Sequence, residues 1–318
     1  MLFLKKIFWF IIYPALKKLQ LYCKHYNLHN SKMYPRAVIV HMTDSTNVSG
    51  LADRFKCFVS SYIIAKENNY DLKILHTNGF FLEEYLTPNI VDWRITKQEV
   101  SYGLNKTRIA MILYKIPKFS KKIQQWHIYG AQNIIPHLSA DTPYIWHEVF
   151  WKLFKLSPRF SALLNDSLSA SLGSEWEKIG FIAVHVRFLD FLEKVENTKT
   201  TVSTTDEEKK EMITSVFSTI IKIHNENPLN KILLFTDSPS FLHADLPNYV
   251  HTMAGNIGHI STHRNNRSII DKAFIDIFAI SKAKITYNIA GPGLYPSQFS
   301  EIGAMIGNIP FKRINREQ

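Results

Sequence analysis

The sequence predicts an α/β protein with two domains, each built around a mainly parallel sheet. The chain has 318 residues, of which 46% are hydrophobic, so it is long enough to bury two ordinary cores. A strand–helix–strand pattern follows Arg36, and strands alternate with helices through the last third of the chain. Such alternation is typical of parallel sheets whose faces are covered by helices.

The first strand–helix–strand unit covers residues 37–76. Ala37-Val38-Ile39-Val40 has the apolar run of a buried strand, and a polar loop over 43–47 leads to Gly50. Apolar residues then recur at intervals of three and four from Leu51 to Ala65, which predicts a helix with one apolar stripe. A second strand is expected over 72–76.

The middle of the chain, 79–173, is the hardest part to interpret because prolines divide it into short, aromatic-rich pieces. A helix is expected over 151–165, and a domain boundary within 165–180. The resulting division is an N-terminal basic and aromatic segment over 1–30, a first domain over 35–172 and a second domain over 173–318.

The last third of the chain predicts an open, doubly wound parallel sheet. A capping box at Thr204 or Thr205, with glutamate three residues later, marks one helix start. The expected strands cover 181–187, 231–236, 249–253 and 284–288, and the expected helices cover 206–225, a short stretch after Pro239, 268–283 and 297–307.

The N-terminal segment carries an apolar run from Ile7 to Tyr13 between two lysine pairs. Seven apolar residues cannot span a bilayer, which needs about 20. No small-residue cleavage site follows, so we expect a cytoplasmic location rather than export. Two interpretations stay open: an interfacial anchor on the inner face of the membrane, or a helix packed on the protein body.

The composition is basic, with 38 Lys and Arg against 27 Asp and Glu. A surplus of positive charge attracts phosphates, anionic lipids or nucleic acid, and charge alone does not choose among them. A nucleic-acid or phospholipid binding protein is therefore an alternative, with lysines interleaved with aromatic residues over 114–126. No RRM, KH or zinc-finger signature is present, so no nucleic-acid partner is expected.

No metal site is expected from the sequence. Cys23 and Cys57 are far apart and outside any CxxC pair, which argues against a disulfide framework and a thiolate zinc site. His147-Glu148 lacks the second histidine that a zincin helix requires.

The strand that starts at Phe181 ends in residues suited to binding an anion. His185 and Arg187 lie on one face of this strand, about 6.6 Å apart, at the carboxyl edge where parallel sheets bind ligands. An arginine there can donate two hydrogen bonds to a diphosphate. The alternative is a surface ion pair between Arg187 and Asp190.

Polar residues also follow the next predicted elements. Asp237 ends the strand at 231–236, where it can accept hydrogen bonds from a base or sugar, or cap the helix after Pro239; N-cap statistics favour the cap. Ser297 and Ser300 lie at a helix start, which suits a β-phosphate, although Ser297 can serve as a simple N-cap. Asp276 lies in an apolar helix and can pair with guanine, or lie at the surface.

The order of these motifs resembles the GDP-fucose-dependent fucosyltransferase superfamily, which includes the α1,2-, α1,6- and protein O-fucosyltransferases. The resemblance covers most of residues 36–311. It rests on His-x-Arg-x-x-Asp at 185–190, Phe-Thr-Asp-Ser at 235–238, Asp-Ile-Phe-Ala-Ile-Ser-Lys-Ala at 276–283, Ser-Gln-Phe-Ser at 297–300, a Gly-Leu-Gly-Asn-Arg-like Gly50-Leu51-Ala52-Asp53-Arg54, and Trp151 to Pro158, which is similar to a Leu-Phe-x-Pro-Ser segment.

The resemblance implies a GT-B-like enzyme of two Rossmann-like domains, with the acceptor side in the first and the nucleotide-sugar site in the second. It implies that Arg187 holds the β-phosphate, Asp276 recognises guanine and Ser300 touches the diphosphate. Asp53 stands where the family has Asn or Asp, next to Gly50 and Arg54. Gly50 and Arg54 are candidate donor-site residues together with His185, Asp237 and Ser297. Phe188-Leu189 departs from the family's His-x-Arg-Arg-Gly-Asp form.

The expected reaction is transfer of fucose from GDP-fucose to a glycan or lipid-linked oligosaccharide, with inversion, in surface polysaccharide biosynthesis; another nucleotide sugar is the alternative. No Asp-x-Asp occurs, so Arg187 and helix N-termini would have to neutralise the diphosphate without a metal. Asp53, Glu148 and Asp190 are the candidates for the base that deprotonates the acceptor.

Overall fold

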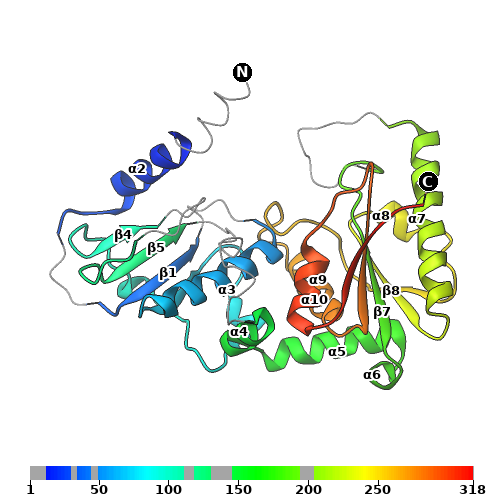
Figure 1. Ribbon diagram of the computed structural model, residues 1–318, viewed down its shortest axis with the longest axis horizontal. Helices are drawn as coiled ribbons and strands as arrows, with labels where there is room; N and C mark the ends of the chain where they lie inside the picture. Colours follow the sequence, from blue (N-terminus) through cyan, green and yellow to red (C-terminus); the bar gives the residue numbers. More distant parts are fainter. Residues whose placement is uncertain are drawn as a thin grey trace. The chain divides into compact units, whose positions relative to one another are not determined.

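The computed structural model describes residues 12–29, 34–43, 49–110, 118–129, 145–193 and 204–317 (Figure 1). The chain forms two compact units, one of Met1–Ser49 and Asp53–Lys155, the other of Gly50–Ala52 and Leu156–Gln318. Most of the apolar run at the N-terminus, most of the polar loop at 43–47 and part of the basic stretch at 114–126 lie outside the described residues.

The first unit is built on a parallel four-stranded sheet of order β2-β1-β5-β4. The central strand β1 is buried on both faces, as its continuous apolar run predicts, and its Val40 lies between Ile74 and Ile128 of the neighbouring strands. The strands are β1 (Ala37–Met42), β2 (Asp71–His76), β4 (Thr107–Ile109) and β5 (Gln125–Tyr129), and β3 (Leu86–Pro88) pairs with β6 (Phe154–Leu156) in a separate two-stranded sheet.

The helix expected after Gly50 is α3 (Leu51–Glu67), which confirms the predicted strand–helix–strand unit. Its apolar stripe packs on aromatic residues from the end of the unit, with the Phe55 ring 5.2 Å from that of Phe150 and the Phe58 ring 5.9 Å from that of Phe154. In the described part of the first unit, the other helices are α2 (Tyr13–His25), η2 (Leu82–Glu84), η3 (Lys97–Glu99) and α4 (Trp146–Leu153).

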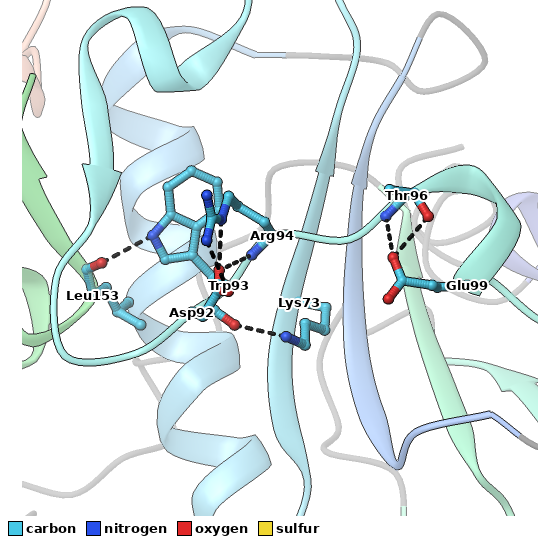
Figure 2. A network of polar contacts seen from close by, with 7 residues as sticks. All are labelled: Lys73, Asp92, Trp93, Arg94, Thr96, Glu99 and Leu153. Atoms are coloured by element: carbon cyan, nitrogen blue, oxygen red, sulfur yellow. Dashed lines mark hydrogen bonds and ion pairs between the residues drawn. The ribbon is translucent and has the colours of Figure 1, made fainter.

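A network of polar contacts fixes the segment after β3 onto the sheet (Figure 2). The Trp93 indole is 1% exposed and donates to the Leu153 carbonyl at 2.9 Å, while Lys73 of β2 donates to the Asp92 carbonyl at 2.7 Å. The Arg94 guanidinium contacts both Asp92 oxygens and lowers the pKa of that carboxyl to about 2. Because the Arg94–Asp92 pair is exposed, burial of Trp93 is the larger stabilising contribution.

The same segment continues into η3, which begins with a capping box. The Glu99 carboxylate accepts from the Thr96 backbone N–H at 2.8 Å and from its hydroxyl at 2.7 Å (Figure 2). The backbone that carries the Lys97 side chain is therefore held in a fixed turn.

Helix α2 packs on the first unit through one face only. Leu21 is buried in a cluster with Ile109 and Tyr129, and the Tyr22 hydroxyl accepts from the Ile109 N–H at 3.1 Å. Leu16 and Leu19 on another face are more than half exposed. Among the described residues, no helix has the length and hydropathy needed to cross a membrane.

The second unit is built on a parallel five-stranded sheet of order β11-β10-β7-β8-β9, which confirms the doubly wound sheet expected from the last third of the sequence. Helix α9 packs against α10 and α5 (Figure 1). The strands are β7 (Phe181–Val186), β8 (Lys231–Thr236), β9 (Val250–Thr252), β10 (Ile285–Ala290) and β11 (Phe311–Asn315), and the helices are α5 (Pro158–Leu172), α6 (Trp176–Ile179), α7 (Asp206–Glu226), α8 (Pro239–Leu242), α9 (Arg267–Ile280) and α10 (Phe299–Gly307).

The boundary between the units lies earlier than the sequence predicted. Residues 156–172, assigned above to the first domain, belong to the second unit because α5 packs on α9, with the Phe160 ring 5.8 Å from Phe274 and 5.5 Å from Phe278. The single helix predicted over 151–165 is also wrong. Strand β6 interrupts it, and α5 starts afresh at a proline whose preceding residue, Ser157, accepts from the Phe160 N–H.

Candidate functional site

The turn after β7 is held by a carboxylate from the end of the neighbouring strand β8. Asp237 Oδ1 accepts from the Phe188 N–H at 2.8 Å, and Oδ2 accepts from the Leu189 N–H at 2.9 Å. Oδ2 also lies 3.6 Å from Arg187 Nε, and both side chains of this ion pair are less than one-fifth exposed. The guanidinium and the turn that carries it are therefore positioned by one acidic group.

Asp237 is not the helix cap that N-cap statistics favoured. Ser238 occupies that position, and its hydroxyl accepts from the Phe241 N–H at 3.1 Å at the start of α8. Strand pairing explains the difference, because β7 and β8 end side by side and the free N–H groups of the β7 turn reach the Asp237 carboxylate first. Asp190, the partner that the alternative interpretation gave Arg187, lies three residues further on and is half-buried.

Leu189 adopts a left-handed backbone conformation, with φ of 53°. For a residue with a β-carbon this conformation costs about 1–2 kcal/mol, a cost that glycine would not have. The bond from the Leu189 N–H to Asp237 offsets part of this cost.

His185 of β7, two residues before Arg187, is buried. Its Nδ1 accepts from the Asn288 amide nitrogen of β10 at 3.3 Å and lies 3.2 Å from the Ser300 hydroxyl of α10. Burial, reinforced by the Arg187 charge, lowers the pKa of His185 to about 3, so the ring is neutral near pH 7. Arg313 of β11 completes the network by donating to Asn288 Oδ1 at 3.1 Å.

The glycine and proline turn before α10 is tied to the end of β7. The Tyr295 N–H donates to the Arg187 carbonyl at 2.9 Å, and the Arg187 guanidinium carbon lies 5.0 Å from the centre of the Tyr295 ring. Ser297 is 1% exposed and its hydroxyl accepts from the Phe299 N–H, although α10 itself starts at Phe299. The structure therefore places the Ser300 hydroxyl against His185 and the turn that carries Ser297 against Arg187. Binding of a nucleotide sugar by these residues stays a prediction.

Asp276 lies in the same unit with a partner from its own helix. The Lys272 ammonium contacts both carboxylate oxygens at 2.6 Å, and the two side chains are 8% and 15% exposed. Burial raises the pKa of the Asp276 carboxyl, and the Lys272 charge opposes that shift. The partner expected for a buried carboxylate is thus Lys272 in this structure, and recognition of guanine stays a prediction.

The remaining predicted site residues lie outside this group. Gly50 precedes α3 and is grouped by its contacts with the second unit, whereas Asp53, Arg54 and Glu148 belong to the first. The Asp53 carboxylate is paired with Lys56 at 2.6 Å, and Glu148 is exposed on α4.

Arg54 is 1% exposed and is fixed from three sides within the first unit. Its Nη1 donates to His76 Nε2 at 2.9 Å, its Nε donates to the Ser49 carbonyl, and its guanidinium lies over the Phe80 ring. Burial, with the Arg54 charge as a smaller cause, lowers the pKa of His76 to about 3. The ring is therefore neutral and can accept this bond.

Sequence reasoning missed the residues that organise the site rather than bind at it. Asn288 and Arg313 are examples, since an asparagine inside the buried strand β10 was a signal that a polar partner lies nearby. Within the described residues, no group of three or more His, Cys, Asp or Glu side chains could hold a metal ion.

Solved structures of fucosyltransferases share the arrangement of helices and strands described above. The crystal structure of NodZ α-1,6-fucosyltransferase soaked with GDP-fucose matches with a TM-score of 0.56 and 13% identity, over 86% of this chain and 92% of that one. NodZ co-crystallised with GDP matches with a TM-score of 0.54 and 14% identity, over 85% and 92% of the two chains. A variant of Arabidopsis thaliana FUT1 in complex with GDP matches with a TM-score of 0.58 and 10% identity, over 96% of this chain and 75% of that one.

The chain has the GT-B-like fold of GDP-fucose-binding fucosyltransferases. This confirms the fold class and the structural resemblance that the sequence motifs indicated. No protein-family model and no curated relative matches the sequence. At 10–14% identity the likeness to these structures establishes the fold, and the activity is argued from the site.

Proposed function

We propose that this fucosyltransferase-like protein is a glycosyltransferase that transfers fucose from GDP-fucose to a glycan, with inversion at the anomeric carbon. The observation that carries the proposal is the convergence of Arg187, His185 and Ser300 where β7 meets the start of α10. A guanidinium and the N-terminus of a helix, gathered at the carboxyl edge of a parallel sheet, suit the diphosphate of a nucleotide sugar.

Arg187 supplies the positive charge in this proposal. Because His185 is neutral, the guanidinium is the cationic group of the cluster, and it stabilises the negative charge that builds up on GDP as the sugar departs. Asp237 holds the guanidinium in place, and N–H groups in the first turn of α10 beyond that of Phe299, which donates to Ser297, bind phosphate oxygens. Ser300 is buried against His185 and must turn away from it to add its hydroxyl. Asp276 accepts from guanine, for which Lys272 must yield at least one carboxylate oxygen.

We further propose that the transfer needs no metal ion. The sequence has no Asp-x-Asp pair to hold a divalent cation beside the diphosphate, and Arg187 with the α10 N-terminus provides the compensating charge. Asp53, Glu148 and Asp190 remain the candidates for the acceptor's base.

The proposed acceptor is a glycan or a lipid-linked oligosaccharide of surface polysaccharide biosynthesis, encountered on the cytoplasmic face of a membrane. The exposed Leu16 and Leu19 of α2, with Lys17 and Lys18 between them, support peripheral membrane contact because apolar side chains can enter the headgroup region while lysines attract anionic lipid.

Calorimetric titration with GDP, UDP and a single-stranded oligonucleotide tests the nucleotide assignment. We expect GDP to bind most tightly, and Arg187→Ala to reduce its affinity at least tenfold and abolish transfer, because a charge-assisted contact to phosphate is worth about 1.5–3 kcal/mol. Arg159→Ala, at an exposed ion pair of the same unit, is the matched control. Tighter binding of UDP would mean that the donor is a UDP-sugar, and tighter binding of the oligonucleotide would mean that the protein binds nucleic acid instead. An active Arg187→Ala variant would refute the mechanism.

A further inference from the structure

The first unit contains a cavity that the proposed donor site does not use. It has a volume of about 340 Å³, within the roughly 300–1,000 Å³ typical of small-molecule pockets. Residues that end three neighbouring strands line it: His41 from β1, Thr77 after β2 and Tyr129 from β5. It therefore lies at the carboxyl edge of the first parallel sheet, where such folds bind ligands.

His41 is the buried polar group of this cavity. It is 1% exposed, and its Nε2 has no hydrogen-bond partner among the described residues. Its ring stacks on Tyr129, with centres 4.3 Å apart and planes 16° from parallel, so its orientation is fixed. Because Nε2 is itself buried, a ligand would contact the part of the His41 ring that lines the cavity.

The lining of the cavity is neutral. Burial, with the nearby His25 as a smaller cause, lowers the pKa of His41 to about 3, and burial followed by Lys24 lowers the pKa of His25. Each neutral imidazole carries one N–H donor and one acceptor nitrogen. Among the described lining residues there is no carboxylate, and the cation is Lys97, which is exposed on η3.

We propose that this cavity binds a neutral sugar ring, the acceptor unit of the reaction proposed above, on which this assignment rests. Sugar hydroxyls both donate and accept, so they match neutral imidazoles and the Thr77 hydroxyl in either orientation. The rings of Tyr102 and Tyr129 offer apolar surface for the C–H groups of the sugar. A phosphate would find only one exposed lysine to compensate its charge, which favours the uncharged ligand.

Lys97 extends the site toward solvent from a rigid base. The capping box of Thr96 and Glu99 fixes the turn that carries it, and the Lys73–Asp92 bond anchors the preceding segment to β2 (Figure 2). Its ammonium group is a hydrogen-bond donor for the outer hydroxyls of the sugar.

Saturation-transfer NMR with the methyl glycosides of glucose, galactose, fucose and N-acetylglucosamine tests the assignment, with inorganic phosphate as the competing probe. We expect at least one glycoside to bind the intact protein and phosphate not to displace it. Thr77→Trp, which fills the cavity from an exposed position, should abolish the signal, and Lys66→Trp, which places the same side chain at the exposed end of α3, should retain it.

His41→Phe keeps a ring stacked on Tyr129 but removes both imidazole nitrogens, and it should weaken glycoside binding about tenfold. GDP affinity, measured on all variants, should equal that of the unmodified protein. Equal glycoside signals with and without Thr77→Trp, or binding of phosphate alone, would overturn the sugar assignment. Glycoside binding without GDP binding would instead refute the proposed donor and leave the sugar site standing.

Discussion

Replacing Asp237 by asparagine tests the claim that this carboxylate holds the turn after β7. The change keeps the size of the side chain and leaves one oxygen for the Phe188 N–H. The new amide nitrogen, however, faces two other donors, the Leu189 N–H and Arg187 Nε. A lost hydrogen bond to a charged group is worth about 1.5–3 kcal/mol, and the Arg187–Asp237 contact at 3.6 Å is too long for a hydrogen bond of its own, so we expect a loss of roughly 2–3 kcal/mol.

Two measurements follow this change. Urea unfolding gives the free energy, and hydrogen exchange of the peptide over 185–190 reports whether the Phe188 and Leu189 amides become labile. Adding Leu189→Gly should restore about 1 kcal/mol, because glycine adopts the left-handed conformation without steric cost. Asp245→Asn, at an exposed position of the same unit, should change the free energy by less than about 0.5 kcal/mol. If Asp237→Asn matches that control and exchange is unaltered, the turn is not held as described.

Two further predictions concern buried titratable groups. The folded-state pKa values of His41, His76 and His185 are about 3, below the ordinary 6.5. Their contribution to stability is therefore present above pH 6.5 and is lost as pH falls toward 3, and between pH 6.5 and 5 each should lower the free energy of unfolding by up to about 2 kcal/mol. A free energy of urea unfolding that stays constant over this range would contradict their burial. Lys272→Met leaves Asp276 buried without its cation and should cost about 3 kcal/mol, measured by thermal unfolding, whereas Lys282→Met at an exposed site should have little effect; equal midpoints would show that the pair contributes nothing.

The periodic parts of the sequence predicted the fold well. The apolar run of β1, the stripe of α3 and the alternation after Phe181 are local patterns, and local patterns determine where a strand or helix forms. The prediction was wrong where packing between distant segments decides the outcome. Residues 156–172 joined the second unit because Phe160 fits against α9, which no local pattern records.

The candidate site divides in the same way. His185 near the end of β7 and Ser300 at the start of α10 were both expected at the carboxyl edge of the sheet, and their side chains lie 3.2 Å apart. The partner of each polar group was not predictable from spacing alone. Asp237 met backbone N–H groups of another strand instead of capping the next helix. The His41 cavity was missed because its lining residues come from separate elements and share no sequence motif.

The ion pair at the end of β7 has a consequence for how a nucleotide would be attracted. The guanidinium of Arg187 already faces the Asp237 carboxylate when no ligand is bound, so much of its field is cancelled at a distance. An incoming diphosphate would be recognised only at contact, through directional bonds from a group whose orientation is set in advance. Any dependence of nucleotide association on ionic strength should then come from the remaining charges of a chain with a formal charge of +11 rather than from Arg187.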